Sequence, residues 1–287
     1  MHTRLSIVRR ERDSADIYQY PEHLRSFIDT LPAAPGVYVF HGDSGTMPLY
    51  IGKSINIRSR VMSHFRTAEE ARMLRQARRV SYYPTAGEIG ALLLEAQMIK
   101  QYQPLHNKRL RRNRQLCAIQ LVQGVPAIVS AKEIDFAHAV DLSGLFSSRH
   151  AAQERLLDIG DSEFLCYSLL GLERISHGRP CFRFHLGRCA GACCGKESPV
   201  EHHLRLMDAL QQMRIFSWPY AGAIGLVERG AGLMQIHVVN NWYYLGSVAS
   251  LSEAADLDKV AKNFDRDGYK ILNGPILSGC HEIIELE

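Results

Sequence analysis

The sequence predicts an α+β protein with more than one domain, and three observations support this fold class. The chain has 287 residues, which exceeds one average domain. Hydrophobic residues make up 46% of it, as in a globular protein with a buried core. Short β-prone runs alternate with segments of helical periodicity, and the chain shows neither an internal repeat nor a low-complexity tract.

The first predicted element is a β-hairpin. Residues 35–38 and 50–53 are short β-prone segments, each with a tyrosine, and they flank a turn-forming run at 41–45. The second segment leads into residues 56–61, where Asn56 is a favourable N-cap. We therefore expect a hairpin followed by a helix.

A longer helix is predicted at residues 88–102. Its apolar residues recur along one stripe, formed by Ala91, Leu94 and Met98. Pro104 fits the end of this helix, because proline disfavours helical geometry in the residue before it. Glu95 lies on the helix flank among leucines, where a lone glutamate is usually a half-exposed surface residue.

These elements divide the chain into four parts. We expect a lead-in segment at 1–25 with little fold signal and a compact domain at 26–110. A connecting β/α region with a cysteine cluster follows at 111–200, and a small α+β module occupies 201–287. The remaining predicted strands are 80–84, 115–122, 127–133, 221–228 and 233–248, and the remaining helices are 151–159 and 201–213.

The hairpin and the long helix together resemble the GIY-YIG nucleases of the UvrC family. Pro-Gly-Val-Tyr stands at 35–38 and Tyr-Ile-Gly-Lys at 50–53, and Leu-Leu-Leu-Glu-Ala precedes Asn107 at the expected spacing. Gly-Leu-Phe-Ser-Ser-Arg at 144–149 extends the similarity over roughly residues 30–200. The resemblance implies a small α/β GIY-YIG nuclease domain, a cysteine-rich segment and a small C-terminal α+β module. For either tyrosine triplet alone, an ordinary hairpin with buried aromatics is the alternative.

The candidate catalytic set is Tyr38, Tyr50, Lys53, Arg60, His64, Glu95 and Asn107. The resemblance implies these positions, with His64 standing where the family usually has tyrosine. Glu95 is the candidate ligand of Mg²⁺ or Mn²⁺, since Mg²⁺ is normally held by one or two carboxylates and otherwise by water and phosphate oxygens. The metal would act as a Lewis acid on the leaving oxygen. Arg60 offers a permanently charged fork to the phosphate.

Tyr50 takes the proton-accepting role that the resemblance implies. A tyrosine normally titrates near pH ~10, so this role needs a nearby cation. We expect Lys53, three residues further on, to supply it.

One position departs from the UvrC pattern. UvrC proteins usually carry tyrosine four residues after the arginine, and this chain has His64. At i,i+4 from Arg60, His64 shares its helix face. An imidazole donates hydrogen bonds as a phenol does but adds a titratable group. The alternative is a surface histidine.

A basic segment follows Asn107 directly. Its five cations within seven residues are Lys108, Arg109, Arg111, Arg112 and Arg114. Charge runs are more often solvated faces than binding sites. Beside a nuclease-like motif, however, this run predicts a track for the DNA backbone that attracts DNA without reading its sequence.

Five of the seven cysteines fall within 29 residues, at Cys166, Cys181, Cys189, Cys193 and Cys194. Their gaps do not match paired C-x2-C zinc ribbons. Four thiolates hold either tetrahedral zinc or an iron–sulfur cluster, and a cluster of thiols without metal is the third possibility. The resemblance implies a 4Fe-4S cluster on Cys166, Cys181, Cys189 and Cys193, with Cys194 spare. We expect Cys117 and Cys280 to be buried thiols.

The resemblance implies a DNA endonuclease of nucleotide excision repair. It would make a single incision on the 3′ side of a lesion, in double-stranded DNA on which UvrA has loaded UvrB. The second nuclease domain and the helix-hairpin-helix pair of UvrC are not seen in the sequence, which predicts one cut. The alternatives are a stand-alone GIY-YIG nuclease on branched DNA and a non-catalytic DNA-binding adaptor.

Membrane and export signals are not found in the sequence. No stretch approaches the ~18 consecutive apolar residues that span a bilayer. The arginine-rich N-terminus also holds Glu11, Asp13 and Asp16 and lacks the apolar core of a signal peptide. We expect a cytoplasmic protein without a membrane partner, whose thiols stay reduced unless they bind metal.

Overall fold

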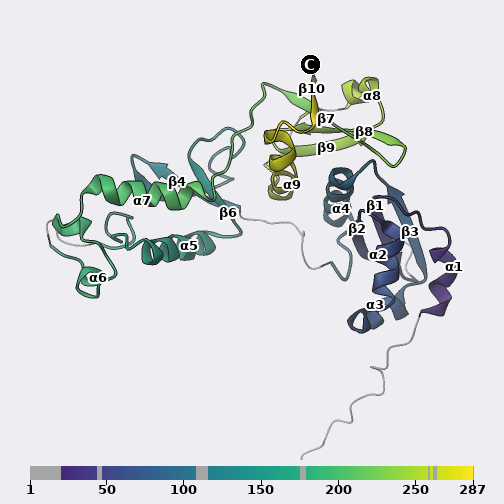
Figure 1. Cartoon of the computed structure of the whole chain (residues 1–287), viewed down its shortest axis with the longest axis horizontal. Helices are drawn as coiled ribbons and strands as arrows, with labels where there is room; N and C mark the ends of the chain where they lie inside the picture. Colours follow the sequence, from purple (N-terminus) through teal and green to yellow (C-terminus); the bar gives the residue numbers. More distant parts are fainter. Residues whose placement is uncertain are drawn as a thin grey trace, which may run out of the picture. The chain divides into compact units, whose positions relative to one another are not determined.

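The computed structural model describes residues 21–43, 47–107, 116–174, 179–257, 259–260 and 264–286 (Figure 1). The chain divides into two compact units, residues 1–109 and 110–287. The described residues form three antiparallel sheets, one in the first unit and two in the second. The α+β class predicted from the sequence is confirmed.

The sheet of the first unit contains the predicted hairpin, whose first strand is central and whose second strand forms one edge. Its strands are β1 (Gly36–His41), β2 (Pro48–Ser54) and β3 (Arg79–Pro84), in the order β2-β1-β3. Tyr38 on the central strand pairs with Gly52 on β2 and with Tyr82 on β3. At the start of β1, a Cβ on Gly36 would lie 2.2 Å from the carbonyl oxygen of Tyr83. Only glycine allows β1 and β3 to approach this closely.

Helical segments surround this sheet. They are η2 (Glu22–Leu24), α1 (Arg25–Ile28), α2 (Ile57–His64), η3 (Ala68–Glu70), α3 (Ala71–Gln76) and α4 (Glu88–Tyr102). Helix α2 begins as predicted, because the Asn56 side chain accepts a hydrogen bond from the Ser59 N–H at 2.9 Å. Helix α4 has the predicted bounds and packs against β1 and β2, although Leu93 rather than Leu94 is fully buried. Leu24 belongs to the core with Tyr38, so this core extends N-terminally beyond residue 26.

The first sheet of the second unit is covered by two helices. Its strands are β4 (Cys117–Val122), β5 (Val125–Ser130) and β6 (Leu142–Phe146), in the order β5-β4-β6. The helical segments here are α5 (Arg149–Ser162), α6 (Phe182–His185), η4 (Ala192–Cys194) and α7 (Pro199–Gln211). Leu156 of α5 and Leu206 of α7 share one core with Ile119 of β4. Because α7 packs with this sheet, we propose a domain boundary after α7 rather than at residue 200.

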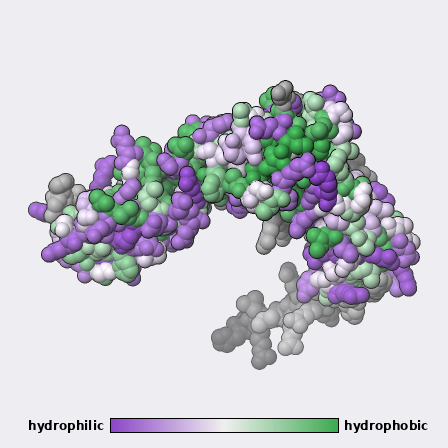
Figure 2. Space-filling view, turned by 45° about the horizontal axis from the view of Figure 1, so that its top comes forward, coloured by the Kyte–Doolittle hydropathy of each residue, from purple (hydrophilic) through white to green (hydrophobic). Residues whose placement is uncertain are grey.

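A four-stranded sheet forms the C-terminal part of the chain. Its strands are β7 (Ala223–Gly230), β8 (Leu233–Asn240), β9 (Tyr243–Val248) and β10 (Glu282–Leu286), in the order β10-β7-β8-β9, with helices α8 (Leu251–Asp256) and α9 (Arg266–Leu277). The single β stretch predicted at 233–248 is wrong, because Asn241 and Trp242 adopt positive φ angles and form a turn. The Trp242 ring is fully buried against Trp218 and Tyr269. Figure 2 shows hydrophobic residues concentrated over this sheet.

Two further sequence expectations have definite outcomes. Cys117 is buried as predicted, whereas Cys280 is exposed, since it lies in the turn between α9 and β10. Among the residues that the structure describes, no helix is long and apolar enough to cross a membrane.

Candidate active site and cysteine cluster

Tyr38 and His64 share a buried hydrogen bond at the centre of the first unit. Tyr38 Oη lies 2.6 Å from His64 Nε2, and both residues are 1% exposed. His64 Nδ1 is hydrogen-bonded to the Glu70 carboxylate. Burial lowers the pKa of His64, and the Glu70 carboxylate opposes this effect. His64 is therefore not a surface histidine, and that alternative is wrong.

Tyr50 lies beside this pair. Its ring centroid is 6.2 Å from that of Tyr38 and 5.5 Å from that of His64. Burial and the nearby Glu95 carboxylate raise the pKa of Tyr50, while Tyr38 and Arg60 lower it in part. Arg60 rather than Lys53 is therefore the cation that favours ionised Tyr50. The Lys53 ammonium donates instead to Glu88 at 2.6 Å.

The two tyrosines are close together because residue 52 is glycine. A Cβ at Gly52 would lie 2.4 Å from Tyr38 Oη and 2.8 Å from Tyr50 Cε1. Burial, followed by the neighbouring Tyr50, raises the pKa of Tyr38 far above its usual range. Tyr38 therefore stays protonated and acts as a hydrogen-bonding group.

The carboxylate of Glu95, on α4, lies against the backbone of β2 near Tyr50. Its Oε1 accepts a hydrogen bond from the Lys53 backbone N–H at 3.1 Å. Burial raises the pKa of Glu95, and this hydrogen bond opposes the rise. Within the described residues Oε2 has no hydrogen-bond partner, so it is available to a hard cation. One half-buried carboxylate fits Mg²⁺, which otherwise keeps water and phosphate ligands.

Asn107 is tied to the backbone of β2. Its Oδ1 accepts from the Ile51 N–H at 2.9 Å, and its Nδ2 donates to the Ile51 carbonyl at 2.8 Å. The backbone of His106 also donates to the Leu49 carbonyl at 2.9 Å. The amide of Asn107 therefore holds the strand between Tyr50 and Gly52 rather than facing open space.

A groove of about 440 Å³ opens beside Tyr50, and its lining includes Arg72, Gln76 and Leu105 together with the carboxylates of Glu69 and Glu70. A second groove shares Arg72, Gln76 and Leu105 and reaches Arg78. The predicted DNA-binding residues Lys108, Arg109, Arg111, Arg112 and Arg114 lie outside the described residues. All of the predicted catalytic residues belong to the first unit.

Four of the clustered cysteines converge in the second unit. The sulfur atoms of Cys166, Cys181, Cys189 and Cys193 all lie within 4.8 Å of one another. Backbone N–H groups of Gly191 and Cys181 point at the sulfurs of Cys189 and Cys193, each at 3.4 Å. Cys194 lies outside this set, as predicted.

This donor set fits a group held by four thiolates. Burial raises the pKa of Cys166 to about 11, so a cation is needed to ionise this thiol at neutral pH. Zn–S bonds of ~2.3 Å separate the sulfurs of a tetrahedral site by about 4 Å. A 4Fe-4S cluster places iron and sulfide between its ligands, so it would require these sulfurs to move apart.

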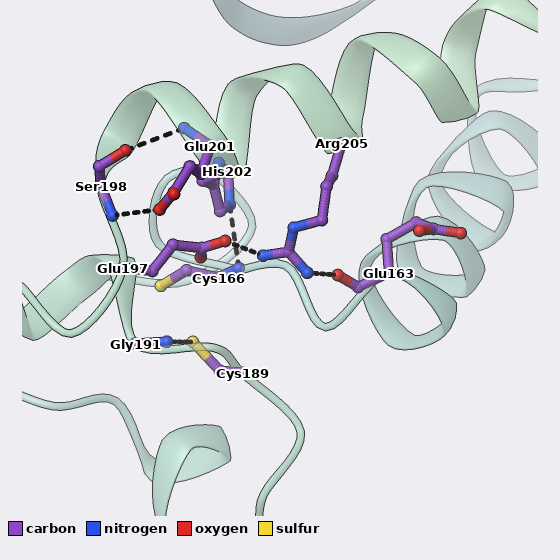
Figure 3. A network of polar contacts seen from close by, with 9 residues as sticks. All are labelled: Glu163, Cys166, Cys189, Gly191, Glu197, Ser198, Glu201, His202 and Arg205. Atoms are coloured by element: carbon purple, nitrogen blue, oxygen red, sulfur yellow. Dashed lines mark hydrogen bonds and ion pairs between the residues drawn. The ribbon is translucent and has the colours of Figure 1, made fainter.

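Polar side chains of α7 support the cluster (Figure 3). The buried imidazole of His202 accepts a hydrogen bond from the Cys166 N–H at 3.0 Å. Arg205 binds the Glu197 carboxylate and the Glu163 carbonyl.

Neither His202 nor Glu70 was identified from the sequence. The capping box of Ser198 and Glu201 was a usable signal for the start of α7, but only the fold places His202 beside a cysteine.

Known proteins resemble each part of the chain. Three family profiles match: the UvrC-like GIY-YIG domain at residues 34–108, the UvrC/Cho excinuclease middle domain at 115–212, and the excinuclease Cho C-terminal domain at 223–287. Excinuclease cho of Escherichia coli K12 is 59% identical over 287 residues, which is 100% of this chain and 97% of that protein. The chain belongs to the excinuclease Cho family.

More distant relatives cover only part of this excinuclease Cho family member. UvrABC system protein C of Deinococcus radiodurans is 31% identical over 63% of this chain and 29% of its own length. A crystal structure of the GIY-YIG N-terminal endonuclease domain of UvrC from Thermotoga maritima, bound to its catalytic divalent cation, is 32% identical. It covers 30% of this chain and 94% of that domain, with a TM-score of 0.28.

Membership of the excinuclease Cho family makes the chain a UvrC-like GIY-YIG excinuclease. It is an endonuclease of DNA repair, as the sequence predicted. The non-catalytic adaptor is therefore set aside.

Proposed function

We propose that this excinuclease makes one incision, on the 3′ side of a lesion, in double-stranded DNA on which UvrA has loaded UvrB. The observation that carries the nuclease part of this proposal is that Arg60 and Glu95 both lie close to Tyr50. Both Arg60 and Glu95 act on the pKa of Tyr50, from opposite directions. The 3′ side and the UvrA and UvrB partners follow from the resemblance to the GIY-YIG half of UvrC.

Each residue of the site has a role in phosphodiester hydrolysis. Tyr50 accepts a proton from the attacking water in its ionised form, which Arg60 favours and which burial and the Glu95 carboxylate oppose. Arg60 donates to the non-bridging phosphate oxygens, where negative charge develops. A Mg²⁺ or Mn²⁺ ion at Glu95 would supply Lewis-acid stabilisation of the leaving 3′ oxygen. The products are a 3′-hydroxyl and a 5′-phosphate.

The DNA backbone approaches along the second groove, which is lined by Arg72, Arg75 and Arg78 and adjoins the groove beside Tyr50. Arg72 lies in both grooves and, within the described part of the chain, has no ion-pair partner. The basic segment from Lys108 to Arg114 continues the positive charge in the sequence after Asn107. Phosphate contacts carry no information about damage. Selectivity for a lesion must then come from a loading complex, which supports a partner such as UvrB.

We further propose that the four-cysteine site holds a 4Fe-4S cluster, with zinc as the alternative. Convergence of four sulfurs supports a bound metal group, and their spacing is close to that of a zinc site. The cluster is proposed from the resemblance to UvrC. The N–H bonds to Cys189 and Cys193 suit thiolates, whose charge they stabilise.

An incision assay tests the function. A duplex with one lesion, labelled at either 5′ end, is incubated with the protein and Mg²⁺, with and without UvrA, UvrB and ATP. We expect one nick on the 3′ side that requires the loaders. Two incisions bracketing the lesion, or efficient lesion-specific cutting without a loader, contradict the proposal. Efficient cutting of a branched duplex without loaders would favour the stand-alone nuclease.

A further inference from the structure

The inference concerns Glu70, an acidic residue on η3 that no motif of the sequence marks. We propose that Glu70 is a positioning residue of the nuclease site, which fixes the protonated nitrogen of His64 and through it orients the Tyr38 hydroxyl. This inference rests on the nuclease site proposed above. It goes beyond that site, because Glu70 is not part of the family motif.

The geometry gives each nitrogen of the His64 ring one partner. Nδ1 bonds to the Glu70 carboxylate and Nε2 lies 2.6 Å from Tyr38 Oη. The ring is 1% exposed, so water does not supply other partners. The Glu70 side chain is 33% exposed and links this buried pair to the surface.

The chemistry of the three groups determines where the protons lie. An ionised carboxylate only accepts hydrogen bonds, so Nδ1 must carry the ring proton. In a neutral imidazole Nε2 is then the acceptor, and Tyr38 must donate to it. This directs the lone pairs of Tyr38 Oη away from His64. Glu70 therefore acts on Tyr38 without touching it, as the outer partner of a ligating histidine fixes its tautomer.

Burial and the Arg60 cation favour the neutral form of His64, and the Glu70 carboxylate opposes it. The groups that face the ring are Tyr38 from β1, Tyr50 from β2, Arg60 from α2 and Glu70 from η3. Burial lowers the pKa of His64, Arg60 lowers it further, and Glu70 opposes both. The orientation of Tyr38 matters for the reaction, since its lone pairs, turned away from His64, accept from the guanidinium of Arg60, the proposed phosphate-binding group.

Glu70 is required because residue 64 is a histidine, whose ring proton can lie on either nitrogen. A tyrosine, which UvrC proteins usually carry here, has one hydroxyl and no second nitrogen whose protonation must be chosen. Glu70 should therefore matter with His64 in place and become dispensable with tyrosine there. This expectation separates a positioning role from a general contribution to folding.

A double-mutant cycle tests the coupling in the full-length protein. The variants are Glu70→Ala, His64→Tyr and the double variant, with Glu22→Ala, an exposed carboxylate of η2 outside both grooves, as the control. We expect Glu70→Ala to lower kcat for DNA nicking by about 10- to 100-fold, the range for outer-shell partners, with KM for DNA unchanged. In the His64→Tyr background the same change should cost less than about threefold. Glu22→Ala should behave as wild type.

A second readout does not depend on activity. Imidazole ¹⁵N chemical shifts report which ring nitrogen carries the proton, and the His64 signal is assigned by its loss in His64→Tyr. We expect the Nδ1–H tautomer in the wild type and in Glu70→Gln, whose amide oxygen still accepts, and loss of it in Glu70→Ala. A wild-type Nε2–H tautomer, or an equal Glu70→Ala defect in both backgrounds, overturns the inference. An inactive wild type with the expected tautomer would instead count against the proposed function.

Discussion

Tyr38 and Gly52 face each other across the hairpin, and the phenol of Tyr38 occupies the space that a side chain at position 52 would need. A Cβ there would lie 2.5 Å from Tyr38 Cζ. Gly52→Ala must displace Tyr38, Tyr50 or both. We expect at least about a tenfold loss of nicking and about 1–3 kcal/mol of destabilisation, as for overpacked cores. Gly274→Ala in α9, where a Cβ meets nothing within 4 Å, is the control in thermal denaturation and nicking assays. Wild-type nicking by Gly52→Ala would contradict this packing argument.

Glu95→Gln should abolish nicking and leave folding and DNA affinity almost intact. The amide keeps an oxygen for the Lys53 N–H but removes the charge that would hold the cation. Tyr50→Phe should reduce nicking strongly without a change in Mg²⁺ affinity. Plasmid nicking and metal titration measure the two effects, with exposed Glu154→Gln as the control. Full Mg²⁺-dependent nicking by Glu95→Gln would refute the assignment of Glu95.

His64 should make the stability of the protein depend on pH. Its folded pKa is lowered by burial, whereas an unfolded histidine titrates near ~6.5. Its contribution to stability is present above that value and is lost as the pH falls toward the folded pKa, because only the unfolded chain then binds the proton. Between pH ~6.5 and ~5, His64→Tyr should flatten the fall in unfolding free energy by up to about 1.4 kcal/mol per pH unit. Denaturant titration measures this slope. Equal slopes for His64→Tyr, the wild type and exposed His138→Asn would contradict the prediction.

The cysteine site should bind metal stoichiometrically. We expect anaerobically purified protein to be brown and to contain iron, and Cys181→Ser and Cys189→Ser to lose both metal and stability, because metal binding here contributes to folding. Cys194→Ser and exposed Cys280→Ser should retain both. Elemental analysis decides: zinc without iron would identify the tetrahedral alternative, which matches the close sulfur spacing. Protein without metal would leave four reduced thiols.

The basic segment should determine the salt dependence of DNA binding. Replacing Arg111 and Arg112 with alanine should reduce the slope of log affinity against log salt by about two, roughly one per lost phosphate contact. Damaged and intact duplexes should be affected equally in the absence of loaders. Fluorescence anisotropy from 50 to 300 mM salt, about a sixfold range, resolves this change. An unchanged slope would place the phosphate contacts elsewhere.

The sequence correctly predicted those helix boundaries that depend on interactions between residues close together in the chain. The N-cap at Asn56 and the bounds of α4 depend on capping and apolar spacing within one segment, and both are confirmed. The turn at Asn241 and Trp242 was missed because two residues with positive φ there carry no glycine to mark them. The buried tryptophan ring holds this turn through tertiary packing, which no local pattern records.

The catalytic set could be taken from a family pattern, but the partners of its members could not. Lys53 and Arg60 are both near Tyr50 in the sequence, and only the fold shows that Lys53 bonds to Glu88. The burial of His64 could not be predicted, because α2 is too short for the spacing of its apolar residues to show which side of the helix faces the core. Glu70 and His202 act across 6 and 36 residues of sequence, which is invisible to any motif.

The amide of Asn107 completes an otherwise open strand edge at Ile51, as a neighbouring strand would. The basic segment begins at the next residue of the chain. If that segment binds DNA as proposed, Asn107 connects the DNA-binding residues to the backbone between Tyr50 and Gly52. Asn107 would then join substrate binding to the spacing of the two tyrosines, because the Ile51 backbone that it holds lies directly between Tyr50 and Gly52.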